Sequence, residues 1–380
     1  MNDRMEFGIV GAGISASMIA RDTRTSKFVK LGAICDVEED VVRNFAVTNG
    51  LDSSRCYTDL SKMLTRDDLD FVVVSVPPYL HKPTGIQIAK ARKHVVVEKP
   101  ITTTLEDADE LIRVCEGEGV ELFAVSQKRY EGDVLRAKSL MPKLGNVFYA
   151  EMRSRWFRPQ SYFEGKDGRI NWKGKWKLAG GGALLNQGIH GLDVLFYLCG
   201  ELERVRARGK IANHRNIEVE DLISANGIIH NGPDVEIYAS TCDLGRDHTE
   251  IHILGRNGKI VLDDYCFVPG SGIYSPTGNL VEPFISSKTA SVEGVDEGRV
   301  GNPLSHGGHE VQLEYIAREL GGTPVSGISM VRGKDARDTL MSALAIYQSI
   351  EEKGRELWLP LQDHRYAPNP EVMSERLSFR

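Results

Sequence analysis

The 380-residue sequence lacks long apolar runs, and none reaches the roughly 18 residues that a membrane-spanning helix needs. It also leaves no room for a secretory signal peptide, because an apolar segment typical of a protein core begins already at Phe7. The 6 cysteines are scattered, without a Cys-x-x-Cys pair, and a chain of this length seldom needs disulfides. We therefore expect a cytoplasmic protein that does not span a membrane.

Clusters of positive charge are missing as well. The chain carries 47 lysines and arginines against 53 aspartates and glutamates, a net charge of -6, and no basic block comparable to a nucleic-acid footprint. No set of histidines, cysteines and carboxylates has the spacing of metal ligands. These absences argue against nucleic acid and an acidic membrane surface as partners, and we expect no bound metal.

What is present is the composition of an ordinary globular protein, with 41% hydrophobic and 26% charged residues. The length exceeds that of a typical single domain, so two domains are expected. Their boundary is predicted where alternating strands and helices give way to successive strands, which divides the chain into residues 1–126 and 127–380.

A glycine-rich turn follows the first apolar strand. Residues 7–10 form a predicted buried strand, and Gly11-Ala-Gly-Ile-Ser-Ala16 leads from it into a helical run over residues 15–24. Glycines in a G-x-G-x-x-A turn between a strand and a helix let backbone N–H groups meet a pyrophosphate at the helix N-terminus. The same glycines could also form an ordinary turn, so the motif alone does not establish a dinucleotide site.

A carboxylate at the end of the next strand favours a bound dinucleotide. Residues 29–35 form a second predicted strand, and Asp36 follows it, about 20 residues after the glycines. A carboxylate there accepts the ribose hydroxyls of an adenosine and repels a 2′-phosphate, and no arginine stands beside it. NAD is therefore favoured over NADP. Asp36 could instead cap the helix predicted over residues 38–48, and one residue could do both.

Strands and helices then alternate up to residue 126. Continuous apolar strands are typical of a parallel sheet that is buried on both faces. Repeated strand–helix units predict a doubly wound parallel sheet, a Rossmann domain, with its ligand at the carboxyl ends of the strands. The predicted strands cover residues 71–76, 94–97 and 122–126, and the predicted helices cover residues 82–92 and 105–118.

Two of these strand ends carry unusual residues. They are Val76-Pro-Pro-Tyr-Leu-His81 and Glu98-Lys-Pro100. Prolines end the hydrogen-bond ladder of a strand and stiffen the loop that follows it. These two loops would flank a nicotinamide. Lys99 would lie at the mouth of the ligand crevice as a cation that can bind and polarise a substrate oxygen. Alternatively, Lys99 is a solvated surface lysine and the prolines are ordinary loop residues.

A polar face on one helix is the main functional feature of the second domain. After Gly180-Gly-Gly182, a helix with 3.6 residues per turn would place Asn186, His190 and Asp193 on one face beside an apolar stripe. The glycines would let a flat ligand approach the start of the helix. An imidazole titrates near neutral pH, which suits proton transfer. The alternative is a buried helix with one satisfied histidine.

The rest of the second domain has the pattern of an α+β fold on an open, mostly antiparallel sheet, with a hairpin turn at Arg256-Asn-Gly258. The segment 269–308 is rich in Gly, Ser and Pro and is expected to form a lid or a subunit arm. A helix is predicted over residues 333–352, followed by an extended arm after Leu361. The predicted strands cover residues 147–156, 204–212, 222–230, 235–242, 249–254 and 258–262.

Candidate substrate contacts combine cations with aromatic rings. Such a set suits a polyol or an anionic sugar, because rings stack on C–H surfaces and cations bind carboxylate or phosphate. The candidates are Arg153, Tyr162, Trp172 and, from a later helix, His309. Alternatively, the strand residues are core, the charges are solvated and His309 caps its helix.

Together these motifs resemble the glucose–fructose oxidoreductase / inositol dehydrogenase (Gfo/Idh/MocA) family, over nearly the whole chain and in the family's order. The glycine motif is generic, whereas the lysine–proline motif combined with the histidine helix is specific. The matching residues are Gly11-x-Gly13-x-x-Ala16, Pro77 with His81, Lys93-His-Val95 leading into Glu98-Lys-Pro100, the triple glycine with Asn186, His190 and Asp193, and His309-x-x-Gln312.

The resemblance implies a nicotinamide-dependent oxidoreductase that acts on a sugar, a cyclitol or a sugar derivative. It implies that Lys99 hydrogen-bonds the reacting hydroxyl, often beside a cis Pro100, and that His190 is the acid/base. Asp193 would hold neighbouring hydroxyls or orient the imidazole. Asn186 would contact the substrate, but many family members have aspartate there, which argues against close kinship with inositol dehydrogenases. The implied cofactor contacts are Gly11, Gly13, Ile14, Ala16, Asp36, Val76, Pro77, His81, Glu98, Lys99 and Gln127.

The family's open sheet also implies a homodimer or a homotetramer. Two other functions are considered, of which the first fits the same residues. In a glycoside hydrolase, bound NAD would oxidise the sugar transiently and be regenerated, so that aglycone is released without NADH. A non-catalytic NAD-binding regulator would need neither Lys99 nor His190. The sequence leaves the identity of the substrate and the direction of the reaction open.

Overall fold

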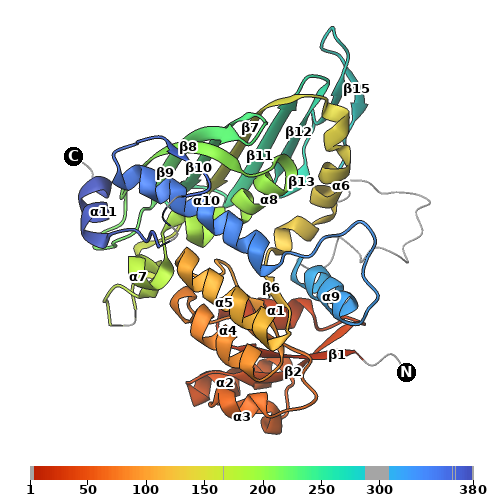
Figure 1. The fold of residues 1–380 in the computed structure, drawn as a ribbon, viewed down its shortest axis with the longest axis vertical. Helices are drawn as coiled ribbons and strands as arrows, with labels where there is room; N and C mark the ends of the chain where they lie inside the picture. Colours follow the sequence, from red (N-terminus) through yellow and green to blue (C-terminus); the bar gives the residue numbers. More distant parts are fainter. Residues whose placement is uncertain (1–3, 166, 287–307, 362, 364, 379–380) are drawn as a thin grey trace. The chain divides into compact units, whose positions relative to one another are not determined.

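The computed structural model describes residues 4–165, 167–286, 308–361, 363 and 365–378. These residues form two compact units, each of which is described by itself (Figure 1). Unit 1 holds the described residues up to Thr102, then Glu106–Gln127 and the stretch from Gly308 to Arg337. Unit 2 holds the other described residues.

Among the described residues, unit 1 is built on a six-stranded parallel sheet with the strand order β3-β2-β1-β4-β5-β6. Its central strands are apolar runs without exposed residues, as parallel strands between two helical layers require. The order reverses between β1 and β4, and ligands of such sheets bind at the carboxyl ends beside that point. The predicted Rossmann domain is confirmed. Its strands are β1 (Met5–Val10), β2 (Val29–Cys35), β3 (Cys56–Tyr57), β4 (Phe71–Val74), β5 (His94–Val97) and β6 (Leu122–Ala124), and its helices are α1 (Ile14–Asp22), α2 (Glu39–Asn49), α3 (Leu60–Leu64), α4 (His81–Lys90) and α5 (Leu105–Glu118).

Unit 1 also includes a helix from late in the chain, so a single boundary after residue 126 does not describe the two units. Helix α9 (Gly308–Leu320) packs against α1 and β2. The Gln312 side chain accepts a hydrogen bond from the Ser126 N–H at 3.0 Å and donates one to the Ala124 carbonyl at 2.7 Å. Buried polar groups at a strand end need such partners. Gln312 therefore supplies them to the backbone at the end of β6 and fastens α9 there.

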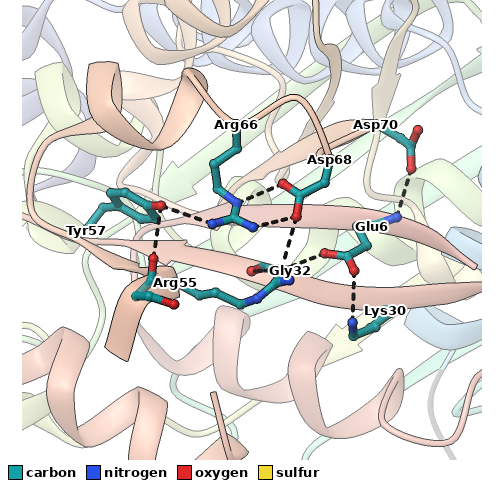
Figure 2. Close-up of polar contacts among 9 residues, drawn as sticks. Glu6, Lys30, Gly32, Arg55, Tyr57, Arg66, Asp68 and Asp70 are labelled. Carbon is teal, nitrogen blue, oxygen red and sulfur yellow. Dashed lines mark hydrogen bonds and ion pairs between the residues drawn. The ribbon is translucent and has the colours of Figure 1, made fainter. Parts of the chain in front are cut away.

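A network of charged side chains connects β1 and β2 with the short turn before β3 (Figure 2). Arg55 donates to Glu6 at 2.7 Å and to the Gly32 carbonyl at 2.9 Å, and Lys30 donates to Glu6 at 2.8 Å. These groups are partly exposed, so each pair adds at most about 1 kcal/mol to stability. The network contains no residue predicted for the site, and we assign it a structural role.

Unit 2 is built on a ten-stranded sheet, counted over the described residues, with the order β15-β14-β12-β11-β7-β10-β9-β8-β16 and β13 paired to β12. Every named pair is antiparallel except β7 with β10. The predicted mostly antiparallel sheet is confirmed. Its strands are β7 (Val147–Arg155), β8 (Leu202–Lys210), β9 (Leu222–Ile229), β10 (Asp234–Ser240), β11 (His248–Gly255), β12 (Gly258–Asp263), β13 (Cys266–Phe267), β14 (Gly272–Tyr274), β15 (Leu280–Pro283) and β16 (Leu357–Trp358).

Helix α8 (Ile189–Cys199) packs on one face of this sheet. A Cβ at Gly191 would lie 2.9 Å from Met152 Cγ and 2.7 Å from Thr249 Cγ2, so the helix backbone lies close to β7 and β11. Side chains along β7 alternate between a buried row and a half-buried row. The buried row faces α8. The other helices of this half of the chain are α6 (Gly132–Leu140), α7 (Trp176–Ala179), α10 (Gly333–Glu351) and α11 (Pro370–Leu377).

One prediction for the C-terminal part stays untested and another needs correction. The segment 269–308 begins with the paired strands β14 and β15, but its residues 287–307 lie outside the described residues, so its role as a lid or a subunit arm stays a prediction. The tail after Leu361 ends in α11 rather than in an extended arm. Asn369 caps α11 by accepting from the Glu371 N–H at 3.0 Å, and Met373 is buried one turn below. A helix of 8 residues offers too little apolar periodicity for a prediction from sequence.

Among the helices of the described residues, none combines the length and the apolar character that crossing a lipid bilayer requires.

Candidate functional site

The glycine turn after β1 leaves backbone groups accessible to a ligand. Gly11 has φ of 91°, and a Cβ there would overlap the Ser75 carbonyl oxygen, so only glycine fits. A Cβ at Gly13 would meet no atom within 4 Å. This open space at the first turn of α1 is what a pyrophosphate needs. Ala16 is fully buried, so its small side chain lets α1 lie close to its neighbours.

Asp36 is held at the carboxyl end of β2 by two backbone N–H groups. Its carboxylate accepts hydrogen bonds from Ala12 at 2.8 Å and from Glu38 at 3.1 Å. Asp36 therefore connects the glycine turn with the residue before α2, whose N-cap is Glu38 and not Asp36. The predicted contact of Asp36 with the ribose hydroxyls stays a prediction. Ile14, in α1, and Val37 are 81% and 84% exposed. Exposed apolar side chains next to a fixed carboxylate suit the adenosine end of a dinucleotide.

Two buried polar atoms after β4 and β6 have no hydrogen-bond partner among the described residues. They are Ser75 Oγ and Gln127 Oε1. An unsatisfied buried polar group costs about 1–3 kcal/mol, and each such group in a native protein calls for an explanation. Both follow the carboxyl ends of parallel strands, where this fold binds ligands. Unit 1 therefore fits a dinucleotide. Ser75 was not predicted, and its only signal in the sequence is a hydroxyl after a fully apolar strand.

Lys99 follows β5, and its backbone is held by its neighbour Glu98. The Glu98 carboxylate is buried and accepts hydrogen bonds from Ser15 Oγ in α1 and from the Lys99 N–H at 3.1 Å. The Lys99–Pro100 peptide bond is cis, as the resemblance implies. Glu98 thus joins the Lys99 loop to α1, and its predicted contact with the cofactor stays a prediction.

His81 is enclosed by protein and contacts the two proline-containing loops. Its Nδ1 lies 2.8 Å from the Pro100 carbonyl oxygen, and its Nε2 lies 2.9 Å from the Val76 carbonyl oxygen. Burial lowers the pKa of the imidazole, which favours the neutral form, and this form donates one of the two hydrogen bonds. The geometry supports a positioning role for His81, which holds the loop of Val76 and Pro77 next to the Lys99 loop.

His309 lies in α9 and bonds within unit 1. It is 5% exposed, and its Nδ1 lies 2.9 Å from the Asp22 carboxylate in α1. Burial acts to raise the pKa of Asp22, but hydrogen bonds from His309 and Arg21 lower it below its ordinary value. This contact holds α9 against α1. It offers no support for His309 as a substrate contact.

The helix predicted after the triple glycine is not regular. Leu184–Gly188 forms a π-helical turn, and α8 begins at Ile189. The spacing of 3.6 residues per turn, on which the common face of Asn186, His190 and Asp193 depends, therefore does not hold before α8. Asn186 and His190 are half-buried, whereas Asp193 is buried. Turns of this kind are frequent at functional sites.

The glycines before this turn make room for protein groups, so the predicted approach of a flat ligand is wrong. A Cβ at Gly181 would overlap the Tyr347 hydroxyl, and one at Gly182 would overlap the Glu220 carbonyl oxygen. The buried Glu220 carboxylate accepts hydrogen bonds from the N–H groups of Gly182 at 2.8 Å and Leu184 at 3.0 Å, and from Tyr347 Oη at 2.9 Å. Through these hydrogen bonds Glu220 positions the start of the helix that carries His190. Burial raises the pKa of Glu220 to about 7.

Asp193 forms an ion pair within unit 2. Its carboxylate accepts hydrogen bonds from Arg129 Nη2 at 2.6 Å and Nε at 2.7 Å, and from the Thr339 hydroxyl at 3.4 Å. Bidentate pairs of this kind fix the geometry of the elements that carry them. The structure therefore gives Asp193 a role in positioning α8, and its predicted contact with substrate hydroxyls or with the imidazole stays a prediction.

Replacement of Asp193 by leucine is expected to lower the free energy of unfolding by about 3–5 kcal/mol, because the half-buried Arg129 guanidinium would lose the carboxylate that faces it. Chemical denaturation measures the change. A double variant, Asp193→Leu with Arg129→Met, is the control and should recover much of the loss, since it removes both charges. Unchanged stability combined with lost turnover would instead place Asp193 in the chemistry.

Arg153 lies on the face of β7 that points away from α8. It follows Met152, which packs against the helix, and successive side chains of a strand point to opposite faces. It pairs with Glu151 on the same strand and, at 3.7 Å, with Glu236 on β10. The alternation therefore argues against Arg153 as a substrate contact beside α8.

Tyr162 and Trp172, by contrast, come together around a cation. Lys173 Nζ lies 4.7 Å from the centroid of the Tyr162 ring and 5.3 Å from that of Trp172. Gln187, in the π-helical turn, donates to the Tyr162 hydroxyl at 3.3 Å and connects this group to the helix of His190. Lys173, Gln187 and the nearby Arg158 were not selected from the sequence. The alternation of basic and aromatic residues was the available signal.

His214, Asp221 and Cys242 form the one group of possible metal ligands found among the described residues, with ligand atoms within 4.8 Å of one another. Both ring nitrogens of His214 face acceptors, the Asp221 carboxylate at 2.9 Å and the Arg158 carbonyl at 2.7 Å. Burial acts to lower the pKa of His214, but these two acceptors raise it above its ordinary value. The arrangement fits a hydrogen-bonded pair of His214 and Asp221 that holds the backbone of Arg158, since both ring nitrogens already face acceptors of the protein.

Comparisons with known proteins agree with this architecture. The sequence model of the oxidoreductase family with an NAD-binding Rossmann fold, GFO_IDH_MocA, matches residues 5–126, and that of the GFO/IDH/MocA C-terminal domain matches residues 135–261. The WlbA dehydrogenase of Bordetella pertussis, solved with NADH and UDP-GlcNAcA, superposes with a TM-score of 0.75 at 27% identity, over 94% of this chain and 100% of that chain.

Two curated relatives are similar in sequence. The 2,7-anhydro-N-acetylneuraminate hydratase of Escherichia coli (strain K12) is 30% identical over 202 residues, 52% of this chain and 50% of that protein. The match thus spans about half the length of that relative. The myo-inositol 2-dehydrogenase of Thermotoga maritima is 27% identical over 274 residues, 68% of this chain and 75% of that protein. Because the two family models together cover most of the chain, in the order of the two units, the protein belongs to the Gfo/Idh/MocA family of NAD-binding oxidoreductases.

Proposed function

We propose that the protein is an NAD-dependent oxidoreductase that transfers a hydride between the nicotinamide and a hydroxyl- or keto-bearing carbon of a sugar, a cyclitol or a sugar derivative. The observation that carries this proposal is the fit of unit 1 to a dinucleotide, with Lys99 held at the end of β5 by Glu98. A relative named myo-inositol 2-dehydrogenase and a structural neighbour that binds NADH with a nucleotide sugar support the substrate class.

Oxidation of an alcohol removes a hydride from carbon and a proton from oxygen. NAD, when bound, supplies the hydride acceptor. The His190 imidazole takes the hydroxyl proton, and the Lys99 ammonium stabilises the negative charge that develops on the oxygen. Two unit charges about 4 Å apart interact by about 4 kcal/mol at an effective dielectric constant of about 20, which is enough to change a rate strongly. In the reverse direction the same groups return the proton. Asn186 would bind a neighbouring hydroxyl.

A screen for NAD reduction tests the proposal. The purified protein is incubated with NAD and with inositols, aldoses, uronates and nucleotide sugars, and the products are identified. Formation of NADH in equal amount with a keto or lactone product is the expected result. Persistent inactivity across the panel would favour a non-catalytic NAD-binding regulator.

A redox-neutral reaction with bound NAD is a second candidate, favoured by the relatives named 2,7-anhydro-N-acetylneuraminate hydratase. The glycoside hydrolase considered from the sequence belongs to the same class, since neither reaction consumes NAD. Incubation with glycosides separates the candidates. Released aglycone without NADH supports the redox-neutral reaction, and accumulating NADH supports the dehydrogenase.

Asp36 is expected to set the preference for NAD. Replacement of Asp36 by alanine removes the carboxylate that repels a 2′-phosphate, so the ratio of NAD to NADP affinity should fall at least about tenfold. Calorimetric binding of both dinucleotides measures the ratio without any substrate. Asp40→Ala, which removes an exposed carboxylate in the first turn of α2, is the matched control. An unchanged ratio in Asp36→Ala would assign the carboxylate to the helix alone.

We also propose a homo-oligomer, a dimer or a tetramer, in which the face of the unit 2 sheet opposite α8 contacts a second copy. Its half-buried charged residues include Glu151 and Arg153. A reducing compartment, the cytoplasm, is proposed because all 6 cysteines are free.

A further inference from the structure

Lys173 carries a positive charge for which the described part of the chain offers no counter-ion. It lies in the single turn Trp172–Gly174, with its ammonium over the rings of Tyr162 and Trp172. Burial lowers the pKa of this ammonium, and among the described residues no charged neighbour acts to raise it. Its neighbours are therefore aromatic faces rather than a carboxylate.

Arg158 brings a second cation to the same ring. Its guanidinium carbon lies 5.5 Å from the centroid of the Tyr162 ring and 4.7 Å from that of Trp156. Asp247 accepts a hydrogen bond from Arg158 Nη1 at 2.6 Å and balances that charge. Arg158 Nη2 faces Gln187 Oε1 at 3.4 Å. Two cations and one carboxylate thus meet around Tyr162, and one positive charge is left over.

The backbone of this cluster is held before any ligand binds. The Asn171 side chain accepts a hydrogen bond from the Lys173 N–H at 2.9 Å and donates one to the Tyr162 carbonyl at 3.0 Å. His214 donates from Nε2 to the Arg158 carbonyl at 2.7 Å. A site that is ordered in advance loses less entropy when its ligand binds, and such order is typical of a binding site.

An ammonium that is partly withdrawn from water without a counter-ion is unfavourable, and cation–π contacts at a partly exposed site return only part of that cost. A ligand that carries a carboxylate or a phosphate would supply the missing charge. A neutral polyol needs only ring faces and hydrogen-bonding groups, which Trp172, Tyr162 and Gln187 already provide. The left-over charge therefore favours an anionic ligand.

We propose that Lys173, supported by Arg158, binds an oxyanion of the substrate, a carboxylate or a phosphate, and so selects acidic sugar derivatives over neutral polyols. This inference rests on the proposed function, since Gln187 connects the cluster to the π-helical turn that precedes His190. Lys173 determines specificity by contact with the charged group of the substrate and takes no part in the hydride step.

Binding of three probes to the NAD-loaded protein tests the inference: D-glucose, D-glucuronate and D-glucose 6-phosphate, followed by tryptophan fluorescence. We expect at least one anion to bind about ten- to a hundredfold more tightly than glucose. Lys173→Met and Lys173→Gln should abolish this preference, whereas Lys173→Arg, which keeps the charge, should retain most of it. Lys177→Met is the matched control, because Lys177 is exposed on α7. Thermal unfolding shows whether each variant is folded.

Equal affinity for glucose and both anions in the unaltered protein would overturn the inference, as would a preference that survives both neutral substitutions, or no binding of either anion. Preference for glucuronate alone assigns the site to a carboxylate, and preference for glucose 6-phosphate alone assigns it to a phosphate. NADH formation is recorded separately. If the protein prefers an anion but forms no NADH, this inference is upheld and the proposed oxidoreductase activity is contradicted. If NADH forms equally well from glucose, the oxidoreductase activity is upheld and this inference is contradicted.

Discussion

Replacement of His190 by alanine is expected to lower kcat by about two to four orders of magnitude, because a positioned general base contributes about that much to proton transfer. NAD should still bind. The groups that fit the dinucleotide, at Gly11, Gly13 and Asp36, belong to unit 1, whereas His190 belongs to α8 of unit 2. Steady-state kinetics and equilibrium binding of NAD measure the two effects separately.

His230→Ala is the matched control for this variant, since His230 is an exposed histidine of unit 2. Its turnover should equal that of the unaltered protein. Imidazole added to the solution should restore part of the turnover of His190→Ala if the missing group is the base. Normal turnover of His190→Ala would show that the assignment of the acid/base is wrong.

Replacement of Lys99 by methionine is expected to lower kcat by about 10²–10³-fold, the usual effect of removing one donor from a developing oxyanion. Methionine keeps the apolar stem of the side chain. Glu98 bonds the backbone N–H of residue 99, so the loop should keep its shape, and the Kd of NAD should change little. Lys90→Met, an exposed lysine at the end of α4, is the control. A variant that turns over normally once NAD is bound would limit Lys99 to cofactor binding.

The double variant of His190 and Lys99 shows whether both side chains act in one step. Groups that act together lose nearly all of their effect when either is removed. The double variant should therefore be little slower than the slower single variant. Losses that multiply would mean that the two residues act independently.

The alternation of strands and helices in unit 1 could be predicted because the signal is local. β2, β5 and α5 have the predicted bounds, since each apolar run or helical period ends at a polar or glycine-containing turn. Helix α9 could not be assigned to this unit. Its attachment depends on Gln312 and His309, which bond residues far away in the sequence.

The errors around the histidine helix have the same cause. Sequence periodicity showed an apolar stripe and polar positions, but the π-helical turn is held by Glu220, which comes from a segment after β8 and is buried beneath the helix. Arg153 has the charge of a substrate contact, but strand alternation places it on the other face of the sheet. Residue types indicate which chemistry is possible, and only the tertiary contacts decide which groups are left for a ligand.

A crystal structure with NAD and a slowly reacting substrate or an inert analogue tests the central claim most directly. We expect Lys99 Nζ and a ring nitrogen of His190 each to lie about 3 Å from one substrate oxygen, whose carbon faces the nicotinamide ring. If either nitrogen bonds elsewhere, or if the substrate oxygen contacts only one of them, the proposed division of labour between the ammonium and the imidazole is contradicted.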